Sequence, residues 1–201
     1  MATKLLEKVY TLIDNENAAD PNVENIDGKT VAKELIYGRR MTKTLLQLEP
    51  NASEALKIAV RAQHVCRWQI PRESYPMDRK GYLKWRADLK KFHADKASSI
   101  LTQLNYESDI IERVSFLLQK KRLKKDNETQ TLEDVACLVF LNYYFDDFIK
   151  KHDESKVVDI ISKTWNKMSA AGHKAALQIA YSQKGEKLVH EAVGKPSRTG
   201  I

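Results

Sequence analysis

Arginine and aromatic residues gather in one short stretch of this 201-residue sequence. Five of the ten arginines lie within 26 residues, interleaved with tryptophan and tyrosine, which is far more than an even distribution would place there. Guanidinium groups bind phosphate or carboxylate through two hydrogen bonds and stack on aromatic rings, so this stretch predicts an anion-binding site. The alternative is that the arginine stems simply pack against the tryptophans. We expect the ligand to contact Arg67, Trp68, Arg72, Tyr75, Arg79, Tyr82, Trp85 and Arg86.

Two histidines and two acidic residues extend this candidate site. His64 and His93 each have apolar or aromatic residues one helical turn away, which predicts that both imidazoles face inward from successive helices. Asp134, next to Glu133, lies on an apolar helix face, where a carboxylate needs a cation, a metal ion or hydrogen-bond donors. The alternatives are that the histidines are satisfied core residues and that the two carboxylates only occupy a first helical turn, where the helix dipole favours negative charge.

The elements that position these residues are predicted to be helices. No glycine or proline lies between Tyr82 and Ala171, and a run of 90 residues without either is typical of helical structure. We expect an all-α, single-domain bundle of about eight to nine helices over residues 1–194, followed by a flexible tail at 195–201. The expected helices are Thr3–Asp14, Lys29–Leu48, Ser53–Gln69, Arg79–Leu104, Ser108–Leu123, Leu132–His152, Ser155–Ser169, His173–Ser182 and Glu186–Ala192.

Several helix starts carry local signals. Asn51 and Glu54 form a capping-box pattern, and helices are also expected to begin at Asp27-Gly28 and at Thr131. The polar segment before Thr131 reads as a surface loop over 124–130.

A rigid connection is predicted between the two helices of the arginine-rich stretch. Pro71 and Pro76 fix an extended backbone, which would project Arg72 and Tyr75 near the ends of both helices. Asp78 is placed to cap the second helix.

Composition limits the function classes. With 34 Lys and Arg against 27 Asp and Glu, the net charge is +7, which favours an anionic partner. The charged N-terminus and the lack of a long apolar stretch predict a soluble, cytoplasmic protein without a membrane partner. Basic residues over 120–125 would serve a nuclear location or nucleic-acid contact, or form a solvated face. Cys66 and Cys137 are expected to be buried free thiols. Gly-rich phosphate loops, a Ser-His-Asp signature and a His-Glu-x-x-His motif are absent.

The sequence resembles a known family. The stretches RAQHVCRWQIPR at 61–72, GYLKWR at 81–86 and LEDVACLVFL at 132–141, together with Tyr75-Pro76, are similar to the domain of unknown function family 4202, small all-helical proteins of fungi and bacteria. The resemblance covers most of the chain and implies little about activity. Some members carry a glutamyl-tRNA synthetase label, which implies a tRNA-related RNA as a partner, although this sequence lacks the nucleotide-binding motif of such an enzyme.

A more distant similarity implies a metal. His64, His93 and Asp134 come in the order of the ligands of the HD metal-dependent phosphohydrolase superfamily. The resemblance implies that they hold a divalent ion such as Mn, Fe, Co, Ni, Zn or Mg. If the protein is such an enzyme, we expect Glu133 and Arg67 to be catalytic, Glu133 by orienting the water or a histidine ligand and Arg67 by neutralising the phosphate. The chain departs from the pattern because alanine, not aspartate, follows His93. Either another carboxylate completes the site, or the pocket binds only an anion.

Two functions from different classes fit these residues. The first is a metal-dependent phosphohydrolase acting on a nucleotide or another small phosphate ester, in which a metal-bound water attacks and the arginines neutralise the phosphate. The alternative is a non-catalytic protein that binds a small phosphorylated ligand or RNA through the same residues.

Overall fold

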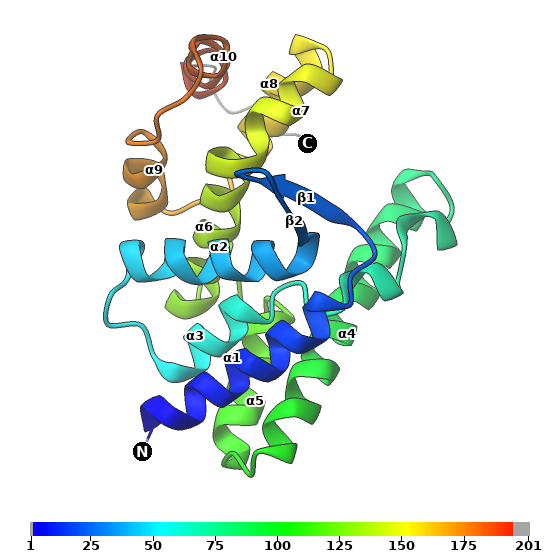
Figure 1. The fold of residues 1–201 in the computed structure, drawn as a ribbon. Helices are drawn as coiled ribbons and strands as arrows, with labels where there is room; N and C mark the ends of the chain where they lie inside the picture. Colours follow the sequence, from blue (N-terminus) through cyan, green and yellow to red (C-terminus); the bar gives the residue numbers. More distant parts are fainter. Residues whose placement is uncertain (1, 195–201) are drawn as a thin grey trace. The chain divides into compact units, whose positions relative to one another are not determined.

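The structure of the protein is a computed structural model that describes residues 2–194. The expected tail at 195–201 lies outside this range. The described residues form ten α-helices and one two-stranded sheet, which confirms the all-α fold (Figure 1). The chain divides into two compact units, residues 1–132 and 133–201, and each is described by itself.

The first unit is built around one short, buried helix. Its elements are α1 (Ala2–Ala18), β1 (Val23–Ile26), β2 (Lys29–Ala32), α2 (Lys33–Leu48), α3 (Glu54–Arg61), α4 (Arg79–Gln103), α5 (Ser108–Leu118) and the first part of α6 (Asn127–Val139). Six of the eight residues of α3 are buried, and α3 contacts α1, α2 and α5. Leu56 and Ile58 of α3 are fully buried with Leu101 of α4 and Leu117 of α5, so apolar burial holds these helices together.

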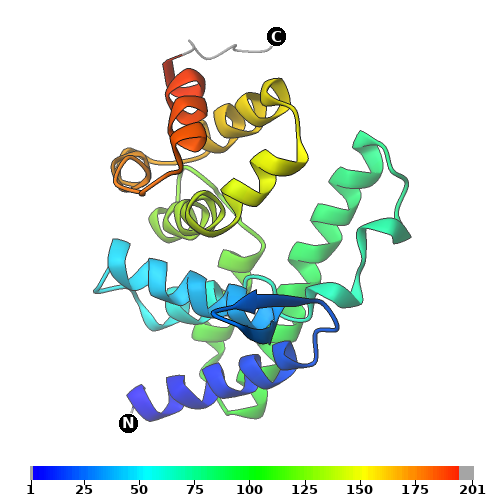
Figure 2. The same cartoon turned by 45° about the horizontal axis from the view of Figure 1, so that its top comes forward.

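The second unit is a smaller helical cluster. It contains the rest of α6, a π-helical turn at Phe140–Tyr144, α7 (Phe145–Lys151), α8 (Glu154–Trp165), α9 (Ala170–Ala176) and α10 (Gln183–Gly194). Helix α8 packs against α10, as Figure 2 also shows. Phe145, Val157, Ile161 and Leu188 supply buried side chains to this cluster.

A β-hairpin replaces the start of one predicted helix. The helix predicted at Lys29–Leu48 begins only at Lys33, because Lys29–Ala32 pairs with Val23–Ile26 in antiparallel register. Asp27 and Gly28 form the two-residue turn with φ angles of 50° and 78°. The prediction that Asp27-Gly28 begins a helix is therefore wrong, since two left-handed residues favour a tight hairpin turn instead.

The predicted helix Ser53–Gln69 ends early, at Arg61. Cys66 has a left-handed φ of 53°, and its backbone N–H donates to Asn17 Oδ1 at 3.0 Å, so a contact with α1 sets the turn at 62–66. The start is also capped differently from the Asn51 and Glu54 prediction, because Ser53 Oγ accepts from the backbone N–H of Leu56.

Two other helix starts can be judged directly. Asp78 caps α4 as predicted, since its Oδ1 accepts from the backbone N–H of Gly81 at 2.6 Å. The loop predicted at 124–130 and the start predicted at Thr131 are wrong, because α6 already begins at Asn127. There Asp126 Oδ1 accepts from the backbone N–H of Thr129, and Arg113 holds the Asp126 carboxylate in place.

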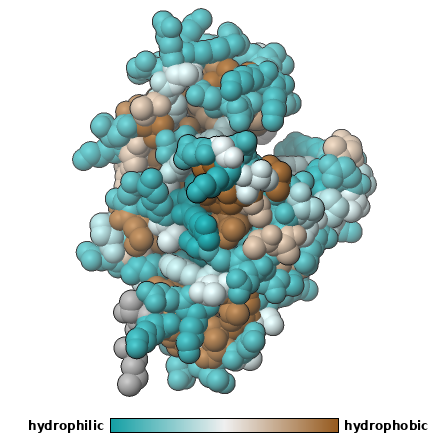
Figure 3. Space-filling model, viewed as in Figure 1, coloured by the Kyte–Doolittle hydropathy of each residue, from teal (hydrophilic) through white to brown (hydrophobic). Residues whose placement is uncertain are grey.

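The face of the molecule drawn in Figure 3 is mainly polar. Hydrophilic side chains cover most of the face shown in Figure 3, and hydrophobic ones lie in separate patches. In the first unit, both ribbon views show the start of α4 and the connection before it standing apart from α1 to α3, and Met77, Tyr82 and Leu83 are exposed there. No helix within residues 2–194 combines the length and apolar character that crossing a membrane requires.

Candidate anion-binding site

A recess in the first unit brings together four residues of the predicted site: His64, Arg67, Arg86 and His93. They come from the turn after α3 and from one face of α4. The recess has a volume of about 20 Å³. It therefore suits one compact group. Its lining residues are Gln63, His64, Arg67, Arg86, Leu89, Lys90, His93, Leu118 and Lys120.

His64 is held in a fixed orientation. Its ring stacks on Tyr37 with centroids 4.0 Å apart and planes 8° from parallel, and its Nδ1 lies 3.1 Å from Glu34 Oε2. Burial lowers the pKa of His64 well below 6.5, and the positive charges of Arg67 and Arg86 lower it further. Burial also raises the pKa of Glu34 to about 7, although Arg67 opposes this effect. At neutral pH the imidazole of His64 is therefore uncharged.

His93 lies beside His64, with ring centroids 5.9 Å apart, and is buried. Its Nδ1–H donates to the backbone carbonyl of Val65 at 2.9 Å, which leaves the lone pair on Nε2. Burial lowers the pKa of His93 to about 3, and the neighbouring His64 lowers it as well. The recess thus contains two neutral imidazoles.

Arg67 and Gln63 leave polar atoms without partners in this recess. The Arg67 guanidinium lies over the Trp85 ring, 4.9 Å from its centroid, and its Nη1 is 3.8 Å from Glu34 Oε1. Its Nε is buried and makes no hydrogen bond, and neither does Oε1 of the buried Gln63. These are two of the three such atoms found in the described part of the chain. Because an unpaired buried polar atom is costly, they point to a ligand or a water that completes the recess.

The donor set fits an anion better than a divalent metal ion. Four cationic side chains, those of Arg67, Arg86, Lys90 and Lys120, line the recess, and no carboxylate lines it. Across residues 2–194, no group of three or more His, Cys, Asp or Glu is arranged to hold a metal ion. Cationic donors attract phosphate or carboxylate oxygens.

The other residues predicted to bind the ligand do not line this recess. The Arg72 guanidinium donates to the backbone carbonyls of Tyr75, Pro76 and Asp78, so it holds the connection before α4 in shape. The Tyr75 hydroxyl donates to a carboxylate of α4 at 2.9 Å. Arg79 and Tyr82 are exposed, Trp68 is half-buried, and the indole of Trp85 donates to Ile70 O at 2.9 Å.

Asp134 and Glu133 lie in the second unit, where both have local partners. Asp134 Oδ1 accepts from the backbone N–H of Ser169 at 2.8 Å, and its Oδ2 accepts from the Ser169 hydroxyl. Ser169 Oγ in turn accepts from the backbone N–H of Gly172 and so caps the N-terminus of α9. Glu133 Oε1 lies 4.0 Å from Lys167 Nζ. The hydrogen-bond donors that a carboxylate on an apolar face needs are thus supplied by the start of α9.

Sequence reasoning missed several residues that shape the recess. Glu34 and Tyr37 of α2 hold His64, and Gln63 and Lys90 line the recess. Glu34 is 30 positions from His64, and no spacing rule links them. Gln63 directly precedes His64, a predicted site residue, and this adjacency is the one local signal that points to Gln63.

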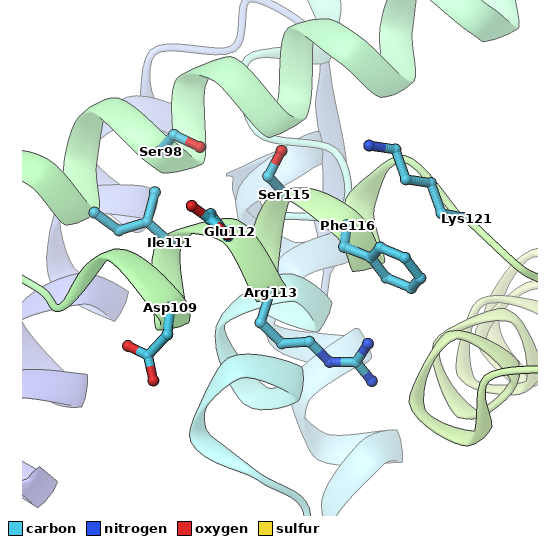
Figure 4. A pocket seen from close by; sticks show the side chains of 8 residues that line it. All are labelled: Ser98, Asp109, Ile111, Glu112, Arg113, Ser115, Phe116 and Lys121. Atoms are coloured by element: carbon cyan, nitrogen blue, oxygen red, sulfur yellow. The ribbon is translucent and has the colours of Figure 1, made fainter.

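A larger hollow lies elsewhere in the first unit, between α4 and α5, with a volume of about 590 Å³ against about 20 Å³ for the recess. Figure 4 shows its side chains spread along α5 rather than converging, with the Arg113 guanidinium directed away. That guanidinium is already paired with Asp126 and Glu128. The hollow carries both signs of charge and none of the unpartnered buried atoms, so the recess is the stronger candidate site.

The buried His93 makes stability depend on pH. The unfolded chain takes up this proton near pH 6.5, whereas folded His93 stays neutral down to about pH 3. The contribution of His93 to the free energy of unfolding is therefore fully present above pH 6.5 and is lost at up to about 1.4 kcal/mol per pH unit below it. His93→Gln keeps a donor for Val65 O but cannot titrate. We expect the stability difference between wild type and His93→Gln to shrink by about 2 kcal/mol from pH 7.5 to 5 in urea unfolding.

The matched control is His190→Gln, because His190 is an exposed histidine in the second unit. The stability difference for His93→Gln is expected to change with pH by more than the difference for His190→Gln. A difference for His93→Gln that does not change with pH would contradict the assignment of His93 as a buried neutral imidazole.

Comparison with known proteins gives one match. Residues 7–189 match the family described as "Domain of unknown function (DUF4202)". The match spans parts of both units and includes every residue that lines the recess. No curated protein and no solved structure matches the chain.

Proposed function

Since the chain belongs to the DUF4202 family, whose description names no activity, we propose a function from its own residues: the recess binds the phosphate group of a small phosphorylated ligand. One observation carries this proposal. Four cationic side chains line the same narrow recess as two neutral imidazoles and the unpartnered atoms of Arg67 and Gln63. A phosphate group accepts hydrogen bonds from the cationic side chains and from Arg67 Nε–H, and a protonated phosphate oxygen can donate to Gln63 Oε1.

The size of the recess supports a phosphate end rather than a base or sugar. The enclosed space is only slightly more than one water requires, so it admits phosphate oxygens but not a ring. The rest of the ligand would extend toward solvent. Charge-assisted hydrogen bonds in a partly buried site are worth about 1.5–3 kcal/mol each, and a few of them suffice for selective binding.

The metal-dependent hydrolysis expected from the sequence has less support. It needs a third ligand beside His64 and His93, whereas the side chains that share their recess are cations, an amide and two leucines. Those cations would repel a divalent ion. Elemental analysis of protein purified without chelator tests this expectation directly, because a near-stoichiometric metal lost in His64→Ala would restore the hydrolase hypothesis.

Phosphate binding is tested with pyrophosphate as the probe. Arg86→Gln removes one charged donor from the recess and is expected to weaken binding at least about ten-fold by isothermal titration calorimetry. Arg79→Gln is the matched control, since it makes the same charge change at an exposed position of the same helix. Equal losses in both variants, or no binding by the wild type, would overturn the proposal.

Binding of RNA would give a different result from binding of a compact phosphate. Lys121, Arg122, Lys124 and Lys125 are exposed, and contacts from them to a phosphate backbone would make binding strongly salt-dependent. If an RNA oligonucleotide binds with such a salt dependence, and Lys124→Gln weakens it while Arg86→Gln does not, the ligand is nucleic acid and the compact-phosphate proposal is wrong.

A further inference from the structure

We propose that the recess also transfers a phosphoryl group, with His64 Nε2 as the nucleophile that accepts it from an activated phosphate such as an acyl phosphate. This inference rests on the proposed function, because a phosphate must first bind in the recess. It adds a covalent step and assigns the roles of the two histidines and of Glu34.

The orientation of His64 is the first support. Glu34 engages Nδ1 at 3.1 Å, and the ring is stacked on Tyr37, so the imidazole is held through one nitrogen and one face. The other nitrogen, Nε2, lies across the ring from Nδ1, and no hydrogen bond to it is found among residues 2–194, while His64 lines the recess. A histidine held in this way has its second nitrogen available for nucleophilic attack.

The carboxylate behind the ring distinguishes His64 from His93. Attack through Nε2 leaves the ring positively charged, with the proton still on Nδ1. The Glu34 carboxylate stabilises that charge by accepting from Nδ1–H, as the third member of a nucleophile relay does. The Nδ1–H of His93 instead meets the neutral Val65 carbonyl, and its side chain is buried. Only His64 has both a carboxyl partner and access to the recess.

The cations around His64 are a further support for phosphoryl transfer. Arg67, Arg86 and Lys120 stand close enough for their charges to act on its imidazole. Burial has the larger effect in keeping the ring unprotonated before the reaction, and the cations add to it. They would also stabilise the charge spread over the three oxygens of the phosphoryl group in the transition state.

The proposed step balances without another cofactor. The Nε2 lone pair forms a bond to phosphorus, and the bond from phosphorus to the acyl oxygen breaks, so that the carboxylate leaves with the electron pair and needs no proton. Water then attacks phosphorus and the P–N bond breaks, which returns neutral His64 and releases phosphate. The sum is an acyl phosphate and water converted to a carboxylate and phosphate, with no change of oxidation state.

The test uses the full chain and radiolabelled acetyl phosphate. We expect the protein to take up label that survives alkali and is lost in mild acid, the signature of a phosphoramidate, and peptide mass spectrometry to locate it on His64. His64→Gln is expected to incorporate at least 100-fold less label. His190→Gln, a variant of an exposed histidine far along the sequence in the second unit, is expected to label as the wild type does.

Glu34 is a positioning residue, and its variant separates chemistry from binding. In Glu34→Gln the amide oxygen still accepts from Nδ1–H, but the negative charge is gone. Labelling is expected to slow at least ten-fold while pyrophosphate affinity, measured by calorimetry, stays the same or increases. If Glu34 only maintained the local structure, Glu34→Gln would lower the labelling rate and the pyrophosphate affinity together.

The outcomes separate the two proposals. If the wild type binds pyrophosphate but takes no label, or takes it at a residue other than His64, phosphoryl transfer is overturned and phosphate binding stands. If the wild type neither binds nor labels, both fall. Mapping the label in the wild type decides the assignment even if His64→Gln fails to fold.

Discussion

Gly81→Ala is expected to lower the free energy of unfolding by about 3 kcal/mol, at the upper end of the cost of overpacking. A Cβ at this position of α4 would lie 2.0 Å from the carbonyl oxygen of Pro76 and 2.8 Å from its carbonyl carbon. These are main-chain atoms, and Arg72 pins the same carbonyl at 2.7 Å, so the connection cannot yield cheaply. The helix-propensity gain of alanine, up to about 1 kcal/mol, does not offset the clash.

Thermal unfolding followed by circular dichroism measures the effect of Gly81→Ala, and a fall in Tm of roughly 6–12 °C is expected. The control is Gly194→Ala, the same substitution where an added Cβ meets nothing within 4 Å. The clash also displaces the connection that contains Ile70. The Ile70 carbonyl accepts from the Trp85 indole, and the Arg67 guanidinium lies over that indole ring. Weaker pyrophosphate binding should therefore accompany the loss of stability, and an unchanged Tm would refute the close approach.

The second large effect is expected for Asp14→Ala. Arg61 is buried, and its Nε and Nη2 donate to the two oxygens of Asp14 at 2.8 and 2.7 Å. Its remaining Nη1 donates to Thr42. Removing Asp14 leaves a buried guanidinium without its counter-charge, which costs about 3–5 kcal/mol. Urea unfolding at neutral pH measures this loss.

Two comparisons show whether the Asp14 effect comes from burial. Asp159→Ala breaks an exposed ion pair with Lys163 and is expected to cost no more than about 0.5 kcal/mol. The double variant Asp14→Leu with Arg61→Met replaces the pair by apolar groups and is expected to recover most of the loss. A small effect of Asp14→Ala, equal to that of Asp159→Ala, would show that Arg61 is solvated in the folded chain.

The parts of the fold that could be predicted depend on neighbours in sequence. Helix α4 was bounded almost correctly, because Asp78 caps it locally and no breaker follows Gly81. The hairpin at 23–32 was missed although Asp27-Gly28 is a hairpin signal, since its strands are only four residues long. The end of α3 was missed because Asn17, 49 positions from Cys66, fixes the turn that follows. No local pattern encodes such a contact.

The candidate site shows the same division. Four of the predicted residues meet in one recess, because the face spacing of α4 and the clustering of charged residues are visible in sequence. Glu34 and Lys120 come from other elements, and only the folded chain brings them to His64. Arg72 has the residue type of a ligand contact, but its guanidinium is used by backbone carbonyls, which depends on how the connection bends.

The left-handed turn at Cys66 has a chemical consequence for this unit. The Cys66 thiol is buried against Glu16, with its Sγ 3.1 Å from a carboxylate oxygen, and burial together with this carboxylate raises the pKa of the thiol to about 12. Alkylating reagents and peroxides react with the thiolate form of cysteine. The protonated Cys66 thiol of the folded turn is therefore unreactive toward them. Modification of Cys66 therefore requires the turn to separate from α1. The rate of modification measures the local opening of the segment that carries His64.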